Sequence, residues 1–263
     1  MKQTRANRKR SKPRRSVPFL PNFITTIGLF FGFYSISYSL RGNFEVAAFL
    51  ILVSGFVDAL DGRVARVTHS TSLFGKEYDS LSDVVAFGVA PAIMVYLWKL
   101  DAFGRFGFLA CFLFVACGAL RLARFNSDAS GNLSTFTGLP IPIAAAAVTS
   151  FVLLGRVIGD VPWIMVLMGV YVLSFMMVSN IRYPSFKHIS YIRAHPFQLL
   201  VAGLLLVVVV ASAPELMIFI LIMIFIIGGA LWDGVRYLKN KAKERKVDSE
   251  EHHETITRED HNI

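Results

Sequence analysis

The chain has 263 residues, of which 54% are hydrophobic, and its mean hydropathy is +0.55. Soluble domains are about 45–50% apolar, so this composition excludes an ordinary soluble protein and indicates a membrane protein. The formal charge of +9 could indicate a nucleic-acid partner, but the basic residues are distributed as in a membrane protein, and we expect no nucleic acid.

Apolar stretches long enough to cross a lipid bilayer recur along the whole chain. A hydrocarbon core of about 30 Å requires about 20 mostly apolar residues per helix. Eight stretches meet this requirement, near residues 22–40, 44–62, 78–98, 104–124, 139–155, 161–179, 197–212 and 214–236. We therefore predict an all-α fold, a polytopic membrane helical bundle of about eight transmembrane helices within a domain of residues 17–238.

Basic residues gather on one side of the predicted bundle. With the N-terminus inside, 23 of the 27 Lys and Arg residues lie at inner ends of helices, and the outer ends carry only Arg41, Lys99, Arg105 and Arg156. Because basic residues concentrate in cytoplasmic loops, both termini are predicted to face the cytoplasm from an inner membrane. The basic segment 1–16 is expected to favour this orientation, and the charged tail 239–263 to be disordered.

Two cysteines and a proline-rich segment have structural interpretations. Cys111 and Cys117 lie six residues apart, on different faces of one predicted helix, and are expected to be buried, inert thiols. The segment 138–142 opens the fifth predicted helix with Gly138 and two prolines, which suit an unusual loop angle and a first helical turn. Asn22 and Thr25 are interpreted as helix caps at the start of the first helix.

Four aspartates lie near the inner ends of the second and third predicted helices. Asp58 and Asp61 are three residues apart, and Asp79 and Asp83 are four apart, so each pair shares one helical face. The two helices are antiparallel neighbours joined by a short loop, so the four carboxylates are predicted to converge near the membrane surface. Charges are costly in membrane helices and therefore mark a functional site.

The chemistry of this cluster favours metal ions. Oxygen-only ligands bind hard divalent cations, and two Mg²⁺ or Mn²⁺ ions would suit a phosphoryl displacement. The helix surfaces carry only small residues at Gly62, Ala65 and Gly75, so a bound group can approach the backbone closely. Arg66 can pair with a phosphate. The four aspartates could instead form simple acid–base pairs that stabilise helix ends. They could also belong to an ion transporter, but a transporter should have its acidic residues at mid-membrane and a repeated architecture.

The cluster and its flanking residues read Asp58-x2-Asp61-Gly62-x2-Ala65-Arg66-x8-Gly75-x3-Asp79-x3-Asp83. This spacing resembles the signature of the CDP-alcohol phosphotransferase family. This resemblance implies a six-helix catalytic core and a homodimer. It also implies that the four aspartates bind the metals and that Asp83 acts as the base. Gly62, Ala65, Arg66 and Gly75 would line the pocket for the CDP group.

The wider sequence suggests which alcohol accepts the phosphatidyl group. Segments 78–91, 120–126, 136–142 and 180–187 resemble membrane-type phosphatidylserine synthases, which implies transfer from CDP-diacylglycerol to serine with release of CMP. Glycerol 3-phosphate or another alcohol is the alternative acceptor. Arg121 and Arg124 are three residues apart at an inner helix end, where they can contact a phosphate or a carboxylate, and Asn126 can bond an amine or hydroxyl. A purely topological role for the two arginines is the alternative.

Overall fold

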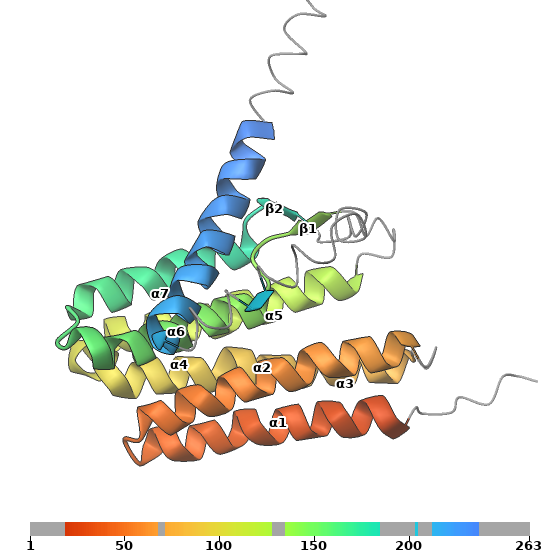
Figure 1. Ribbon diagram of the computed structural model, residues 1–263, viewed down its shortest axis with the longest axis horizontal. Helices are drawn as coiled ribbons and strands as arrows, with labels where there is room; N and C mark the ends of the chain where they lie inside the picture. Colours follow the sequence, from red (N-terminus) through yellow and green to blue (C-terminus); the bar gives the residue numbers. More distant parts are fainter. Residues whose placement is uncertain (1–18, 68–71, 128–134, 185–202, 205–211, 237–263) are drawn as a thin grey trace, which may run out of the picture.

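The computed structural model describes residues 19–67, 72–127, 135–184, 203–204 and 212–236. They form a bundle of long helices with one short pair of strands, which confirms the predicted all-α membrane fold (Figure 1). The labelled helices are α1 (Phe19–Leu40), α2 (Phe44–Val67), α3 (Leu73–Asp83), α4 (Ala90–Val95), α5 (Arg105–Ser127), α6 (Ile141–Ile158) and α7 (Trp163–Val178). Two π-helical segments, Val84–Val89 and Tyr96–Leu100, and a 3-10 turn at Asp101–Phe103 extend α3 and α4 into one long helical unit.

Five helices of the described residues are long and apolar enough to span a bilayer, so the protein is an integral membrane protein. They are Phe19–Leu40, Leu73–Phe103, Arg105–Ser127, Ile141–Ile158 and Pro214–Arg236. The shorter α7 is also apolar, and α2 has 24 residues but carries the charged residues of the site. Most of the helix predicted at 197–212 lies outside the described residues, as do the segments 1–16 and 239–263.

Small residues let the first helices pack closely. A Cβ added to Gly32 of α1 would lie 2.6 Å from the Cα of Ala86, so α1 and the helix that follows α3 touch almost backbone to backbone. The Ser54 hydroxyl of α2 donates a 2.8 Å hydrogen bond to the Gly28 carbonyl of α1. These contacts hold α1 against α2 and against the π-helical segment Val84–Val89. Both cysteines are buried and free, as expected.

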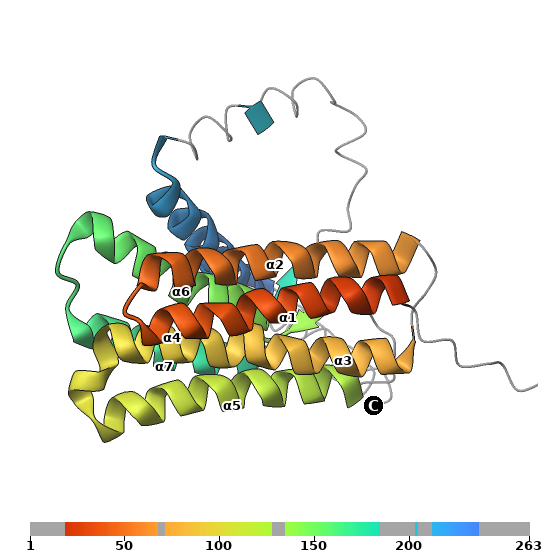
Figure 2. The ribbon, with the colours of Figure 1, turned by 90° about the horizontal axis from the view of Figure 1, so that it is seen from below.

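One end of the bundle gathers the segments that carry the predicted site. The start of α1, the end of α2, the start of α3 and the end of α5 lie at the same end in both views (Figures 1 and 2). Strands β1 (Thr135–Thr137) and β2 (Arg182–Pro184) pair antiparallel near that end. Gly138 has φ +79, and an added Cβ would overlap the Met177 carbonyl oxygen, so this turn requires glycine. Proline stands in the first turn of α6, as predicted.

Candidate active site

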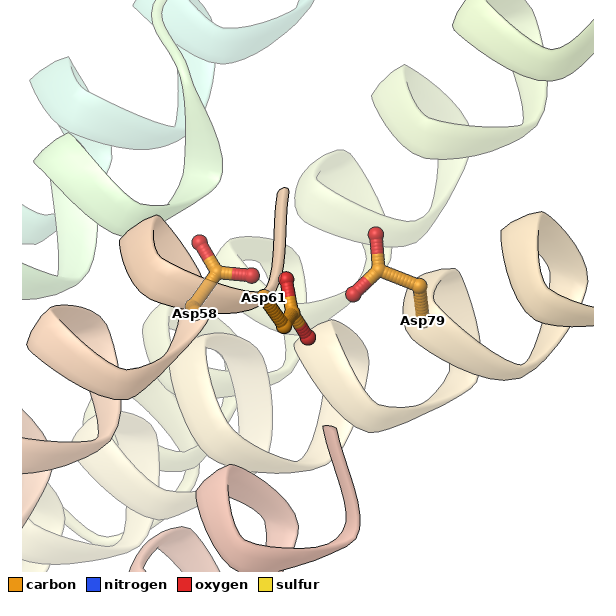
Figure 3. A group of neighbouring side chains, drawn as sticks. All are labelled: Asp58, Asp61 and Asp79. Atoms are coloured by element: carbon orange, nitrogen blue, oxygen red, sulfur yellow. The ribbon is translucent and has the colours of Figure 1, made fainter. Parts of the chain in front are cut away.

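Three of the four predicted aspartates meet between α2 and α3. One carboxylate oxygen each from Asp58, Asp61 and Asp79 lies within 4.8 Å of the other two, and the three side chains turn toward one another (Figure 3). Asp83 lines the same small pocket but is not part of this close group. The four residues therefore line one pocket. Three of the carboxylates form a close group, and the fourth, Asp83, lies further along α3.

Local capping sets the start of α3 and hence the position of its aspartates. Ser72 is the N-cap, and its hydroxyl accepts a 2.9 Å hydrogen bond from the Gly75 backbone amide. Asp79 follows about two turns later, at the level of the last turns of α2, where Asp58 and Asp61 lie. The short connection between α2 and α3 thus brings the two carboxylate pairs to one level.

The first helix adds neutral polar side chains to the site. Thr25 donates a 2.7 Å hydrogen bond to Oδ2 of Asp61, a carboxylate that is only 6% exposed. Asn22 lies beside Gly75, since a Cβ added there would be 3.1 Å from the Asn22 Oδ1 atom. The prediction that Asn22 and Thr25 cap the helix is wrong, because α1 begins earlier, at Phe19. Their three-residue spacing at the end nearest the aspartates was the signal that could have placed them in the site.

Several buried polar atoms at this end of the bundle have no hydrogen-bond partner among the described residues. They are Oδ1 of Asp79, Nδ2 of Asn22, Nε of Arg121 and Oδ1 of Asn126. Buried polar groups in native proteins are nearly always paired, and unpaired groups commonly mark a place for a ligand or an ion. The set holds both acceptors and donors, which suits a ligand that carries metal-binding and phosphate groups.

The residues predicted at the end of α5 have different surroundings. Arg121 is half-buried and interacts electrostatically with Asp83. Arg124 is exposed and donates a 3.0 Å hydrogen bond to the Asn180 side chain after α7. Asn126 donates a 2.9 Å hydrogen bond to Ser80 of α3. Arg121 therefore lies near Asp83, while Arg124 and Asn126 tie α5 to neighbouring segments.

The small residues predicted to line a nucleotide pocket lie on the same helices. Gly62 is exposed, and a Cβ added there would meet no atom within 4 Å, so the surface beside Asp61 is open. Gly75 lies in the first turn of α3, against Asn22. Ala65 and Arg66 belong to the last turns of α2, but their side chains lie outside the described part of the structure.

Comparison with known proteins identifies the family. Residues 18–177 match the family model described as CDP-alcohol phosphatidyltransferase. A Helicobacter pylori protein named CDP-diacylglycerol–serine O-phosphatidyltransferase is 43% identical over 184 residues, which cover 68% of this chain and 77% of the relative.

Two further relatives come from an archaeon and a Gram-positive bacterium. The archaetidylserine synthase of Methanothermobacter thermautotrophicus is 41% identical over 167 residues, 63% of this chain and 69% of its own. The CDP-diacylglycerol–serine O-phosphatidyltransferase of Bacillus subtilis is 36% identical over 169 residues, 64% of this chain and 92% of its own. The matched segment contains all four aspartates of the pocket and the three helices that enclose them, and the chain belongs to the CDP-alcohol phosphatidyltransferase family.

Proposed function

We propose that this enzyme transfers the phosphatidyl group of CDP-diacylglycerol to L-serine, giving phosphatidylserine and CMP. The observation that carries the proposal is the group of three carboxylates within 4.8 Å of one another at one end of a membrane bundle. The choice of serine is supported by the names of relatives in bacteria and archaea that act on serine or form a serine lipid. Glycerol 3-phosphate would need additional cations for its second phosphate.

The donor set fits divalent metal ions. Asp58, Asp61 and Asp79 offer only oxygen, and Oδ1 of Asp79 is buried without a partner among the described residues. Such ligands favour Mg²⁺ or Mn²⁺ over softer metals. We infer that these three aspartates and Asp83 hold two ions, which when bound would neutralise charge on the phosphates of the substrate. Without a cation, the close carboxylates would repel one another.

Asp83 is the residue we assign as the general base. It lines the aspartate pocket, yet it stands apart from the close group of three, which leaves an oxygen to accept a proton. In the proposed reaction the serine hydroxyl loses its proton to Asp83, and its oxygen forms a bond to the β-phosphorus. The bond between that phosphorus and the bridging oxygen breaks, and CMP leaves with the electron pair.

The remaining predicted residues receive binding roles. We assign Gly62, Ala65, Arg66 and Gly75 to the CDP group, because the open surface at Gly62 adjoins Asp61. Arg121 is assigned to a substrate phosphate or carboxylate, since its buried Nε has no partner among the described residues and it lies near Asp83.

Arg124 and Asn126 receive a different role. Each already bonds a protein side chain. We propose that they shape the rim of the site, with the free Oδ1 of Asn126 available to an acceptor amine.

The wider organisation proposed for the protein follows from its charge distribution and its family. We propose a transmembrane catalytic domain at 17–238, flanked by cytoplasmic segments 1–16 and 239–263. The active site and both termini would face the cytoplasm from the inner membrane, because 23 of the 27 basic residues lie on that side. A homodimer is expected from the family, and the bilayer is the expected partner surface, with no role for nucleic acid.

The test is CMP release by the purified protein in detergent with CDP-diacylglycerol and Mn²⁺ or Mg²⁺. Serine, glycerol 3-phosphate and inositol are compared as acceptors, with Asp83→Asn as the control. Serine-dependent release that the substitution abolishes supports the proposal. Release with another alcohol keeps the chemistry and overturns the acceptor, and an absence of metal-dependent release with every alcohol overturns the proposed reaction.

A further inference from the structure

Three of the four basic residues at the end of the bundle opposite the aspartates line one pocket. Arg41 follows α1, Lys99 lies in the π-helical segment Tyr96–Leu100, and Arg156 lies near the end of α6, so three separate segments contribute. The cavity has a volume of about 490 Å³. Glu45 is the single carboxylate among its described lining residues, so the lining carries a net positive charge.

The ion pairs in this pocket leave donors free. Arg156 contacts Glu45 at 2.9 Å and Lys99 contacts Asp160 at 2.6 Å, but the side chains of Arg156, Glu45 and Asp160 are all more than half exposed. One such contact uses few of the five N–H donors of a guanidinium or the three of an ammonium. Arg41 forms no ion pair with a carboxylate among the described residues. Guanidinium and ammonium donors that line one pocket can bind phosphate groups.

An apolar groove lies next to the pocket, on the side of the membrane interior. A second cavity of about 500 Å³ is lined by apolar residues of α6, α7 and the helix Pro214–Arg236. Val95 and Phe151 line this groove, while Lys99 and Gly155, each four residues later on the same helical segments, line the cationic pocket. Four residues advance a helix by about 6 Å, so the two cavities are neighbours. Trp98 of the pocket and Phe151 of the groove pack edge to face, with their ring centroids 6.3 Å apart.

We propose that the pocket and the groove together bind an anionic phospholipid, in the leaflet opposite the active site. Arg41, Lys99 and Arg156 contact the headgroup phosphate, and one acyl chain lies in the groove. A free phosphate ion would not explain the apolar extension. Glu45 and Asp61 are sixteen residues apart on α2, or about 24 Å, so this lipid is distinct from a substrate whose phosphates lie at the aspartates.

The first experiment measures which lipid remains bound to the purified full-length protein by native mass spectrometry. The protein is offered equal amounts of phosphatidylglycerol and phosphatidylcholine. The wild type is expected to retain phosphatidylglycerol, and the double substitution Arg41→Gln, Arg156→Gln to retain about tenfold less, since phosphate–guanidinium contacts are strong charge-assisted hydrogen bonds. Arg105→Gln is the matched control, because Arg105 is the fourth basic residue at that end and does not line the pocket.

A second pair of variants tests the acyl-chain compartment. Gly169 lines the groove and an added Cβ would meet no atom within 4 Å, so Gly169→Leu should fill the groove and reduce lipid retention without a clash. Gly228 is equally open but does not line the groove, so Gly228→Leu should retain lipid as the wild type does. All four variants should keep wild-type CMP release, which shows that they are folded.

Four results would overturn the proposal. The first is equal retention of the two lipids by the wild type, and the second is displacement of phosphatidylglycerol by inorganic phosphate. The third is displacement by CDP-diacylglycerol, which would make the groove part of the substrate site. A loss of retention in Arg105→Gln that equals the loss in the double variant would likewise reject a specific pocket.

Discussion

The hydrogen bond between Thr25 and Asp61 offers a sharp test of how the first helix serves the metal site. Thr25→Val keeps the shape of the side chain and removes its hydroxyl, so Oδ2 of Asp61 loses a donor at 2.7 Å. Asp61 is 6% exposed, and water cannot readily replace that donor. The carboxylate should then adopt orientations that no longer match those of Asp58 and Asp79.

The size of the effect follows from the kind of bond that is lost. A hydrogen bond to a charged group contributes about 1.5–3 kcal/mol, and loss of a residue that orients a metal ligand typically lowers metal affinity or activity by about 10–100-fold. We therefore expect the Mn²⁺ concentration for half-maximal CMP release to rise by about tenfold to a hundredfold. Activity should largely return at saturating Mn²⁺, because the four aspartates remain.

Two further variants separate the hydroxyl from other effects of the substitution. Thr25→Ser retains a donor and should keep the metal dependence of the wild type. Thr26→Val removes an exposed contact of 2.9 Å with the Tyr78 hydroxyl, and should change the metal dependence little. A Thr25→Val variant that follows the wild-type Mn²⁺ curve would refute a role for the hydroxyl, as would a Thr25→Ser variant that loses as much metal affinity as the valine variant.

Three other changes have expected outcomes. Gly32→Leu should lower the melting temperature in detergent, because its Cβ would lie 2.6 Å from the Ala86 Cα, and overpacking typically costs about 1–3 kcal/mol. Arg121→Gln should lower kcat/KM for CDP-diacylglycerol by about tenfold or more in the CMP-release assay, through loss of a charge-assisted hydrogen bond. Lys99 lowers the pKa of Asp160 through a 2.6 Å hydrogen bond. The wild type should therefore melt at a slightly higher temperature than Asp160→Asn at any pH above about 3.9, the pKa of an unfolded-state carboxyl group. This difference should disappear as the pH falls through the lower pKa that Asp160 has in the folded protein.

Each of these expectations has a matched comparison. A Cβ on Gly28 would lie 3.7 Å from Val57, an ordinary contact, so Gly28→Ala should melt near the wild type, and an equal loss in both glycine variants would contradict the packing argument. Arg124→Gln should retain more activity than Arg121→Gln, since Arg124 is exposed and already bonded to Asn180. A stability difference for Asp160→Asn that grows at acid pH would show that the ion pair is not its source.

Spacing within a helix predicted that carboxylates of α2 and α3 would come together. Residues three or four apart share a face whatever the helix packs against, so Asp58 with Asp61 and Asp79 with Asp83 could be paired from the sequence alone. The short connection between α2 and α3 then determined which faces meet. The same geometry explains why Asp83 stands apart, because four residues also move a side chain about 6 Å along the helix axis.

Contacts between distant helices could not be predicted in this way. Thr25 and Asp61 are 36 residues apart, and their meeting depends on the rotation of α1 about its own axis. That helix has no hydrophobic stripe to indicate which face is buried, because its buried residues are small or polar, from Pro21 and Thr25 to Ser35 and Ser39. The hydrogen bond between Asn126 and Ser80 joins residues 46 apart, so it too could not be predicted from spacing within one helix. The strands β1 and β2 have three residues each, too few for alternation to distinguish them from a loop.

The composition of α1 suggests why this helix faces the aspartates. No charged residue occurs between Phe19 and Leu40, and the polar groups that it offers to the site are the neutral side chains of Thr25 and Asn22. A basic residue in their place would pair with Asp61 and cancel the negative charge that attracts a divalent cation. A hydroxyl orients the same carboxylate and leaves its charge intact. Thr25→Lys should therefore abolish metal-dependent activity even at saturating Mn²⁺. The activity of Thr25→Val, in contrast, should be restored by saturating Mn²⁺.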